Sequence, residues 1–148
     1  MDRPPPLFAT DISLFLDALR EVNFIISYQP LADEQDPMKG VEIKNFCSGK
    51  TMINLPLDKN IDPIICVEEI IKQYSPQTAV MFIPGQRFDA YGTRRGRGGG
   101  WYDRFLSRAP SSWIRVGVTD QAHFSDQPLI RQSCDEPMDW IVLLEEKT

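Results

Sequence analysis

The sequence of 148 residues lacks a run of 18 apolar residues, a Cys-x-x-Cys pair and a second histidine. Without such a run, no segment is expected to span a membrane as a helix. Its three cysteines, Cys47, Cys66 and Cys134, are widely spaced, which favours reduced thiols in a cytoplasmic protein over disulfides or a zinc site. His123 has no Gly-x-Ser-x-Gly sequence to accompany it, so a surface or turn position is expected. Residues 1–6 lack the apolar core of a secretory leader.

Basic charge is scarce outside one segment. The net charge is −5, yet residues 87–108 contain six arginines and only two aspartates, so this segment is +4 and the remainder is −9. Nucleic-acid binding generally needs a broad basic face, so this distribution suits a local site for a small anion. An RNA-binding module that uses Arg94, Arg95 and Arg97 is an alternative, although Arg-Gly elements of that kind usually lie in disordered tails.

Apolar patterns predict strands that alternate with helices. Continuous apolar runs predict buried strands at residues 24–28, 79–83, 113–118 and 140–144. Helical spacing or end signals predict helices at residues 12–19, 63–74 and 101–108, with Thr10 or Asp11 capping the first and Asp62 the second. Weaker patterns predict short strands at 41–44 and 51–55, a short helix at 126–132 and an extended Pro-rich arm at 1–9. We therefore expect a single domain over residues 1–148, an α/β fold of three layers whose mostly parallel sheet has helices on both faces.

Glycine is concentrated in residues 84–104, which hold six of the nine glycines. A buried strand is predicted immediately before this stretch, and a helix is predicted to begin at Trp101. A glycine-rich turn before a helix N-terminus exposes backbone N–H groups at the positive end of the helix dipole, an arrangement that suits phosphate. The stretch also follows the carboxyl end of a strand, where ligands bind in parallel α/β sheets. It is therefore predicted to bind a polyphosphate.

The same residues, 84–104, closely resemble the signature of the 5-formyltetrahydrofolate cyclo-ligase (methenyltetrahydrofolate synthetase) family, in the pattern P-G-x-x-F-D-x-x-G-x-R-x-G-R-G-G-G-W-Y-D-R. Two weaker similarities flank it. Residues 26–28, followed by acids at 33, 34 and 36, are similar to an early strand and acidic loop of the family. Residues 134–139 are similar to its C-terminal motif, with Cys134 where His is usual.

The resemblance implies a cytoplasmic, ATP- and Mg²⁺-dependent enzyme that converts 5-formyltetrahydrofolate to 5,10-methenyltetrahydrofolate, with ADP and phosphate as the other products. In this reaction the formyl oxygen attacks the γ-phosphate, and N10 of the folate then closes the ring. The implied partners are therefore two small molecules, the folate and ATP, without nucleic acid or membrane. The sequence gives no indication of the oligomeric state.

The family pattern also implies roles for individual residues. Catalytic neutralisation of charge during phosphoryl transfer falls to Arg94 and Arg97. The ATP-binding residues are Arg94, Gly96, Arg97, Gly98, Gly99, Gly100, Trp101 and Tyr102. The folate-binding residues are Glu34, Asp36, Phe88, Trp101 and Tyr102. The Mg²⁺ ligands are Asp103 and Asp135, since carboxylates are typical ligands of this ion.

Simpler interpretations accompany several of these residues. Asp103 is also placed to pair with Arg104 or Arg108 along a helix, Asp135 to serve as a turn residue, and Trp101 to pack the helix start. A further Lys- and Arg-bearing helix, usual at the start of the family pattern, is not seen in the sequence, and residues 55–83 are shorter than that pattern. The alternative function is therefore a family member that binds nucleotide or folate without turnover.

Overall fold

Six parallel strands form the central sheet of the computed structural model, which describes residues 7–9 and 12–144. Their order is β1-β9-β7-β4-β2-β3, and every neighbouring pair runs parallel. The strands are β1 (Leu7–Ala9), β2 (Phe24–Ser27), β3 (Thr51–Asn54), β4 (Ala79–Ile83), β7 (Ile114–Thr119) and β9 (Trp140–Leu143). Four of them match the predicted buried runs, because a strand covered on both faces has apolar side chains on both sides.

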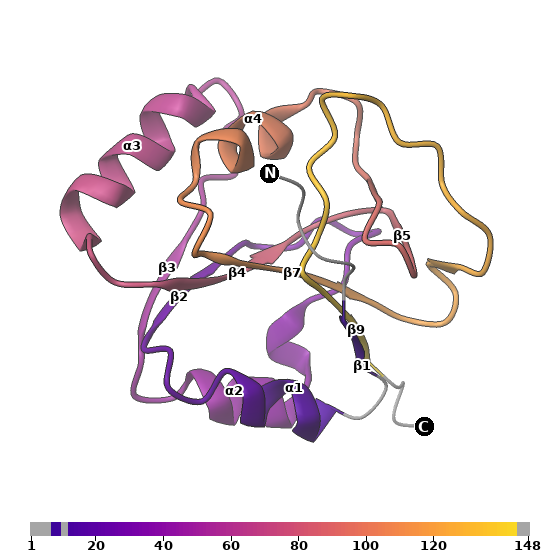
Figure 1. Cartoon of the computed structure of the whole chain (residues 1–148), viewed down its shortest axis with the longest axis horizontal. Coiled ribbons are helices and arrows are strands. Elements are labelled where there is room, and N and C mark those ends of the chain that lie inside the picture. The colour runs from indigo at the N-terminus through magenta and orange to yellow at the C-terminus, as the bar shows by residue number, and fades with distance from the viewer. Residues whose placement is uncertain (1–6, 10–11, 145–148) are drawn as a thin grey trace.

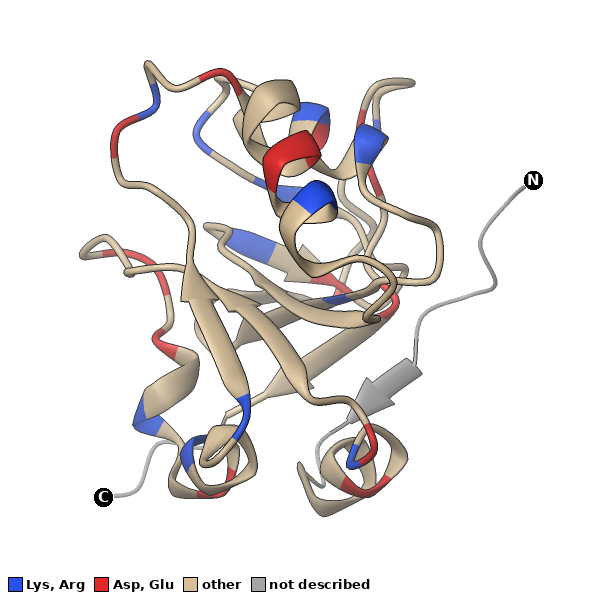
Figure 2. Cartoon of the chain, turned by 90° about the vertical axis from the view of Figure 1, so that its left-hand side faces the viewer, with Lys and Arg blue, Asp and Glu red and all other residues tan. Residues whose placement is uncertain are grey.

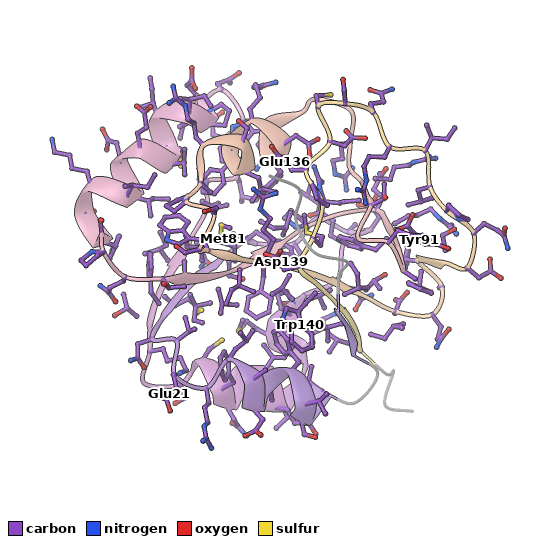
Figure 3. The ribbon with its side chains drawn as sticks, in the orientation of Figure 1. Glu21, Met81, Tyr91, Glu136, Asp139 and Trp140 are labelled. Carbon is purple, nitrogen blue, oxygen red and sulfur yellow. The ribbon has the colours of Figure 1, made fainter. Side chains whose placement is uncertain are left out.

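Helices cover both faces of this sheet (Figure 1). On one face lie α1 (Ile12–Ala18) and α2 (Val41–Cys47), and on the other lie α3 (Pro63–Tyr74) and α4 (Trp101–Arg108). The core is correspondingly divided into two clusters, one on each side of the sheet. Met81 belongs to the cluster under α3 and α4, whereas Trp140 belongs to the one over α1 and α2 (Figure 3). The predicted three-layer α/β class is confirmed.

The start of α3 follows from its sequence. The Asp62 carboxylate accepts hydrogen bonds from the backbone N–H groups of Ile64 and Ile65, at 2.8 and 3.4 Å, and Pro63 occupies the first helical position. Such a cap satisfies N–H groups that have no partner within the helix. Val67 and Ile70, spaced for one helical face, are buried in the core. The predicted bounds of α3 and α4 are confirmed.

Two predicted elements were wrong. Residues 41–44 begin α2 and form no strand. Four alternating residues carry little information, and the helix instead buries Ile43 and Cys47, which lie one turn apart on the same face. Residues 126–132 form no helix in the described part of the chain. Their polar groups bond across the fold: the Leu129 N–H donates to the Asp89 carboxylate at 2.8 Å.

A second, three-stranded sheet in the order β6-β5-β8 lies beyond the end of β4. It contains β5 (Arg87–Asp89), β6 (Arg94–Arg95) and β8 (Phe124–Ser125). Buried Asp89 organises the turn between β5 and β6, because its carboxylate accepts hydrogen bonds from the N–H groups of Tyr91 and Thr93, both at 2.9 Å. This hairpin fixes the backbone of Arg94.

Of the predicted N-terminal arm, residues 7–9 form β1, which pairs with β9, while residues 1–6 lie outside the described residues. The predicted caps at Thr10 and Asp11 also lie outside them. A one-turn 3₁₀ helix, Pro37–Lys39, precedes α2. None of the helices in the described part of the chain has the length and apolarity needed to cross a bilayer.

Candidate functional site

A pocket of about 700 Å³ opens beyond the carboxyl ends of β2, β3 and β4. Its walls come from the segments that follow these strands, from residues 94–104 and from part of the segment 130–135. This is the edge where parallel α/β sheets bind their ligands. Five basic side chains and three acidic ones line the pocket, although the whole chain carries a net charge of −5. Figure 2 shows basic and acidic residues close together in the helices and loops above the sheet.

Arg94 is the most buried cation of this pocket, with 7% of its side chain exposed. Its Nη1 donates to the carbonyl oxygen of Pro84 at 2.9 Å, and its Nη2 lies 3.7 Å from Oδ2 of Asp103. Burial lowers the pKa of the guanidinium, and the charge of Asp103 opposes this effect. Arginine nevertheless stays protonated in proteins. Among the residues that the structure describes, its buried Nε has no hydrogen-bond partner.

Two glycines make room for the Arg94 side chain. A Cβ on Gly85 would lie 2.8 Å from Cγ of Arg94, and a Cβ on Gly96 would lie 2.5 Å from its Nη1. Both distances are far below van der Waals contact, so any side chain at either position would displace the arginine. Gly96 therefore acts on the site through Arg94 as well as by lining the pocket.

The next glycines, 98 to 100, form an open wall before α4. Gly98 and Gly100 have φ values of +90° and +71°, which favour glycine. A Cβ on Gly98 or Gly99 would meet no described atom within 4 Å. Gly100 precedes the helix without a side-chain cap, so the first N–H groups of α4 have no capping partner there. Uncapped backbone N–H groups at a helix N-terminus are donors of the kind that phosphate oxygens accept from.

Arg97 connects the glycine segment to the acidic loop after β2. Its guanidinium forms an ion pair with Asp33 and lies 3.6 Å from the Glu34 carboxylate. Gln86 also donates to Asp33, at 2.8 Å. Two carboxylates therefore hold Arg97 at one side of the pocket, with 44% of its side chain exposed.

Two further carboxylates, those of Asp103 and Asp135, line the pocket. Oδ1 of Asp103 accepts from the N–H of Glu136 at 3.1 Å, and Oδ2 of Asp135 accepts from that of Gln132 at 2.8 Å. Both carboxylates act electrostatically on Arg94. The described residues contain no group of three or more potential metal ligands of the His, Cys, Asp or Glu type. Two carboxylates nevertheless fit Mg²⁺, which takes its other ligands from water and phosphate.

The described ion pair of Asp103 is with Arg94 and not with its helix neighbours. Arg108 pairs with Glu68, and Arg104 donates to the carbonyl oxygen of Gly99 at 3.0 Å. The simpler interpretation of Asp103 as one partner of a pair along α4 was therefore wrong.

Trp101 and Tyr102 start α4, and both are largely buried. The Trp101 indole N–H donates to the Ile61 carbonyl at 2.8 Å, and its ring stacks on Phe105. The Nζ atom of Lys59 lies 4.4 Å from the Trp101 ring and 4.5 Å from the Tyr102 ring. Burial, with a smaller effect from the Glu34 charge, raises the pKa of the Tyr102 hydroxyl. Trp101 thus packs the helix start, whichever ligand the pocket binds.

The sequence and fold of this chain are similar to those of known proteins. The sequence profile of the 5-formyltetrahydrofolate cyclo-ligase family matches residues 31–143. The chain belongs to this family of carbon–nitrogen cyclo-ligases. A solved structure with a similar fold is a 5,10-methenyltetrahydrofolate synthetase from Mycoplasma pneumoniae, with a TM-score of 0.60 and 18% identity over 88% of this chain and 78% of that one. No curated protein matches the chain.

The pocket of this cyclo-ligase family member brings together most of the predicted site residues. These are Glu34, Arg94, Gly96, Arg97, Gly98, Gly99, Gly100, Trp101, Tyr102, Asp103 and Asp135. Asp36 and Phe88 are not among its lining residues. Asp36 instead caps the 3₁₀ helix by accepting from the Met38 N–H at 2.9 Å, and Phe88 is fully buried in the core. A direct folate contact by either residue does not fit these positions.

The lining residues that sequence reasoning missed include Tyr28, Lys59 and Arg104. Tyr28 directly follows β2 and donates its hydroxyl to the Gln35 carbonyl at 2.6 Å, which braces the acidic loop. Lys59 follows β3, and Arg104 holds the glycine segment from α4. Tyr28 and Lys59 follow strands whose carboxyl ends border the pocket. Ligands bind beyond the carboxyl ends of parallel strands, so the argument used for residues 84–104 also applies to these two residues.

Proposed function

We propose that this family member catalyses the ATP- and Mg²⁺-dependent conversion of 5-formyltetrahydrofolate to 5,10-methenyltetrahydrofolate. The main support is the position of Arg94, a buried cation with a free Nε, beside an open glycine wall at the start of α4. A triphosphate placed along that wall brings its charge to the helix N-terminus and to this arginine. Family membership supplies the reaction class.

The formyl group is an amide, whose oxygen is a poor leaving group. In the proposed reaction this oxygen attacks the γ-phosphorus of ATP, and the bond from phosphorus to the bridging oxygen breaks to release ADP. N10 then attacks the formyl carbon, the carbon–oxygen bond breaks to release phosphate, and N10 loses its proton. Each step moves negative charge among oxygens, so fixed cations lower the barrier mainly by electrostatic stabilisation.

Different residues of the chain bind the phosphates, neutralise their charge and hold the metal ion in this proposal. Arg94 neutralises charge on the transferred group, and the Gly98–Gly100 wall (residues 98, 99 and 100) donates backbone N–H groups to the phosphates. Asp103 and Asp135 would hold Mg²⁺, which supplies charge neutralisation between the phosphates when bound. Arg97 exchanges its carboxylate partners for phosphate oxygens, which releases Glu34 to accept from a folate N–H or to orient the formyl group.

The test combines an activity assay with one substitution. Purified protein, ATP, Mg²⁺ and 5-formyltetrahydrofolate should give the near-ultraviolet absorbance of the methenyl product, and Arg94→Lys should lower kcat/KM by about a hundredfold, since lysine cannot reproduce the arginine fork. Arg108→Lys, on the outer part of α4, should act like the wild type. Calorimetric binding of ATP or folate without product would support the alternative, a family member that binds without turnover.

A further inference from the structure

Lys59 is exposed, but its charged end lies against the pocket wall. It lies in the segment between β3 and α3, and its Nζ turns inward over the rings of Trp101 and Tyr102. The same atom donates to the Pro56 carbonyl at 3.1 Å and to the Tyr102 hydroxyl at 3.3 Å. No carboxylate in the described part of the chain forms an ion pair with it. The ammonium therefore contacts rings and uncharged oxygens at the pocket wall, and Glu34 of the same pocket acts on it only through space.

The Tyr102 ring has a second cation near it. The guanidinium carbon of Arg94 lies 5.6 Å from the ring centroid, and Lys59 lies 4.5 Å from it. Burial lowers the pKa of Lys59, Glu34 and then Cys66 oppose this effect, and the charge of Arg94 adds to it by a smaller amount. Two cations that repel each other thus line one pocket, and Arg94 also carries an unpaired Nε. A phosphate between them would reduce the repulsion between the two cations, and its oxygens could accept a hydrogen bond from the Arg94 Nε.

We propose that Lys59 is a further phosphate-binding residue, which leaves the aromatic rings and joins Arg94 on the terminal phosphoryl group of a nucleoside triphosphate. Tyr102 lies in the first turn of α4, so Lys59 and Arg94 flank the helix N-terminus that the glycine wall precedes. A terminal phosphoryl group has three oxygens and can accept from the ammonium, the guanidinium and backbone N–H groups together. The inference rests on the proposed function, because it assigns a residue to the same ATP site.

A long, flexible stem makes this movement feasible. Lysine has four methylene groups and places a point charge, whereas the Arg94 fork is fixed by its bond to the Pro84 carbonyl. The contacts that Lys59 would give up are two cation–π contacts and two hydrogen bonds to uncharged oxygens, each weaker than a bond between the ammonium and an anionic phosphate oxygen. A triphosphate therefore competes successfully for the ammonium.

The test is titration calorimetry of the full chain with Mg·ATP, Mg·ADP, tripolyphosphate and 5-formyltetrahydrofolate. Lys59→Gln should weaken ATP and tripolyphosphate binding by about tenfold or more, while ADP and folate binding change by less than about twofold. Lys59→Arg should retain most of the ATP affinity because it keeps the charge. Lys72→Gln, which removes the same charge from exposed α3, is the matched control, and thermal unfolding checks that each variant is folded.

The outcomes separate this inference from the proposed function. Wild-type ATP affinity in Lys59→Gln would overturn the role of Lys59 even if the enzyme makes methenyl product. Weakened folate binding with unchanged ATP binding would also overturn it, because Lys59 would then bind the substrate carboxylates. Selective loss of ATP and tripolyphosphate affinity in a protein that makes no product would support the phosphate site and reject the reaction. A wild type that binds neither polyanion would contradict both.

Discussion

A Cβ atom on Gly96 would lie 2.5 Å from Nη1 of Arg94. The glycine and the arginine are two residues apart in the sequence, and the smaller one determines where the larger one can lie. Arg94 bonds to Pro84 and pairs with Asp103 only because this space is free. Gly96 thus serves the site by leaving room for Arg94 as well as by lining the pocket.

Gly96→Ala should therefore lower activity with little effect on the fold. The methyl group displaces the Arg94 guanidinium, and we expect kcat/KM to fall by about tenfold or more, with a loss of about 1 kcal/mol in the free energy of unfolding. Steady-state kinetics and chemical denaturation measure the two quantities. Gly40→Ala is the control, because its Cβ would meet no atom closer than 3.4 Å. An unchanged kcat/KM in Gly96→Ala would show that the position of Arg94 does not matter.

Gly99→Val tests the open wall without disturbing Arg94. Its Cβ would meet no described atom within 4 Å, and its φ is not in the left-handed region, so the folded protein should accept the side chain. ATP affinity should fall by about tenfold or more, because valine fills the space that the phosphates need. Gly98→Val is a poorer test, since its φ of +90° adds strain. If calorimetry gives wild-type ATP affinity for folded Gly99→Val, the phosphates do not lie along this wall.

The sequence could predict most of the fold because its strongest signals are local. Asp62 and Pro63 begin α3 through capping contacts within one turn, and the run from Ala79 to Ile83 is apolar because helices cover both faces of β4. Where the local signal was only four residues long, at 41–44, the prediction failed. There the helical spacing of Ile43 and Cys47 on the sheet decided the structure.

The candidate site was predictable only where its residues are adjacent in the sequence. Residues 94–103 are consecutive and run from β6 into the start of α4. The family pattern could therefore be recognised from their order in the sequence alone. The contact between Lys59 and the ring of Tyr102, and the ion pair between Arg97 and Asp33, join loops that follow different strands. Such contacts depend on side-chain directions after folding, which periodicity and composition do not encode.

Asp33→Asn should strengthen ATP binding by a few fold. In the structure Asp33 holds Arg97 by an exposed ion pair, and this carboxylate competes with phosphate for the guanidinium. Exposed ion pairs contribute about 1 kcal/mol or less to stability, so the fold should tolerate the change. The variant is compared with Asp17→Asn, which removes the same charge from an exposed position on α1. Weaker ATP binding in Asp33→Asn than in Asp17→Asn would mean that the ion pair organises the phosphate site.

Cys47 gives a prediction for the pH dependence of stability. Burial raises the pKa of this thiol from 9.0 to about 11. The folded state therefore favours the neutral thiol, a stabilisation that is complete below pH 9 and is lost as the pH rises through 11. The difference in unfolding free energy between wild type and Cys47→Ala should be constant below pH 9 and should shrink from there to pH 11. A difference for Cys47→Ala that stays constant from pH 8 to pH 11 would contradict the burial of a neutral thiol.

The central claim is that ATP drives ring closure of 5-formyltetrahydrofolate in this pocket. The most direct measurement follows methenyl absorbance and ADP release together in one reaction that contains Mg²⁺ and the wild-type protein. The account predicts that both signals appear, that they rise in equal amounts, and that neither rises when ATP or the folate is omitted. In a folded sample, methenyl product without ADP would contradict this claim. ADP release at the same rate with and without the folate would contradict it too.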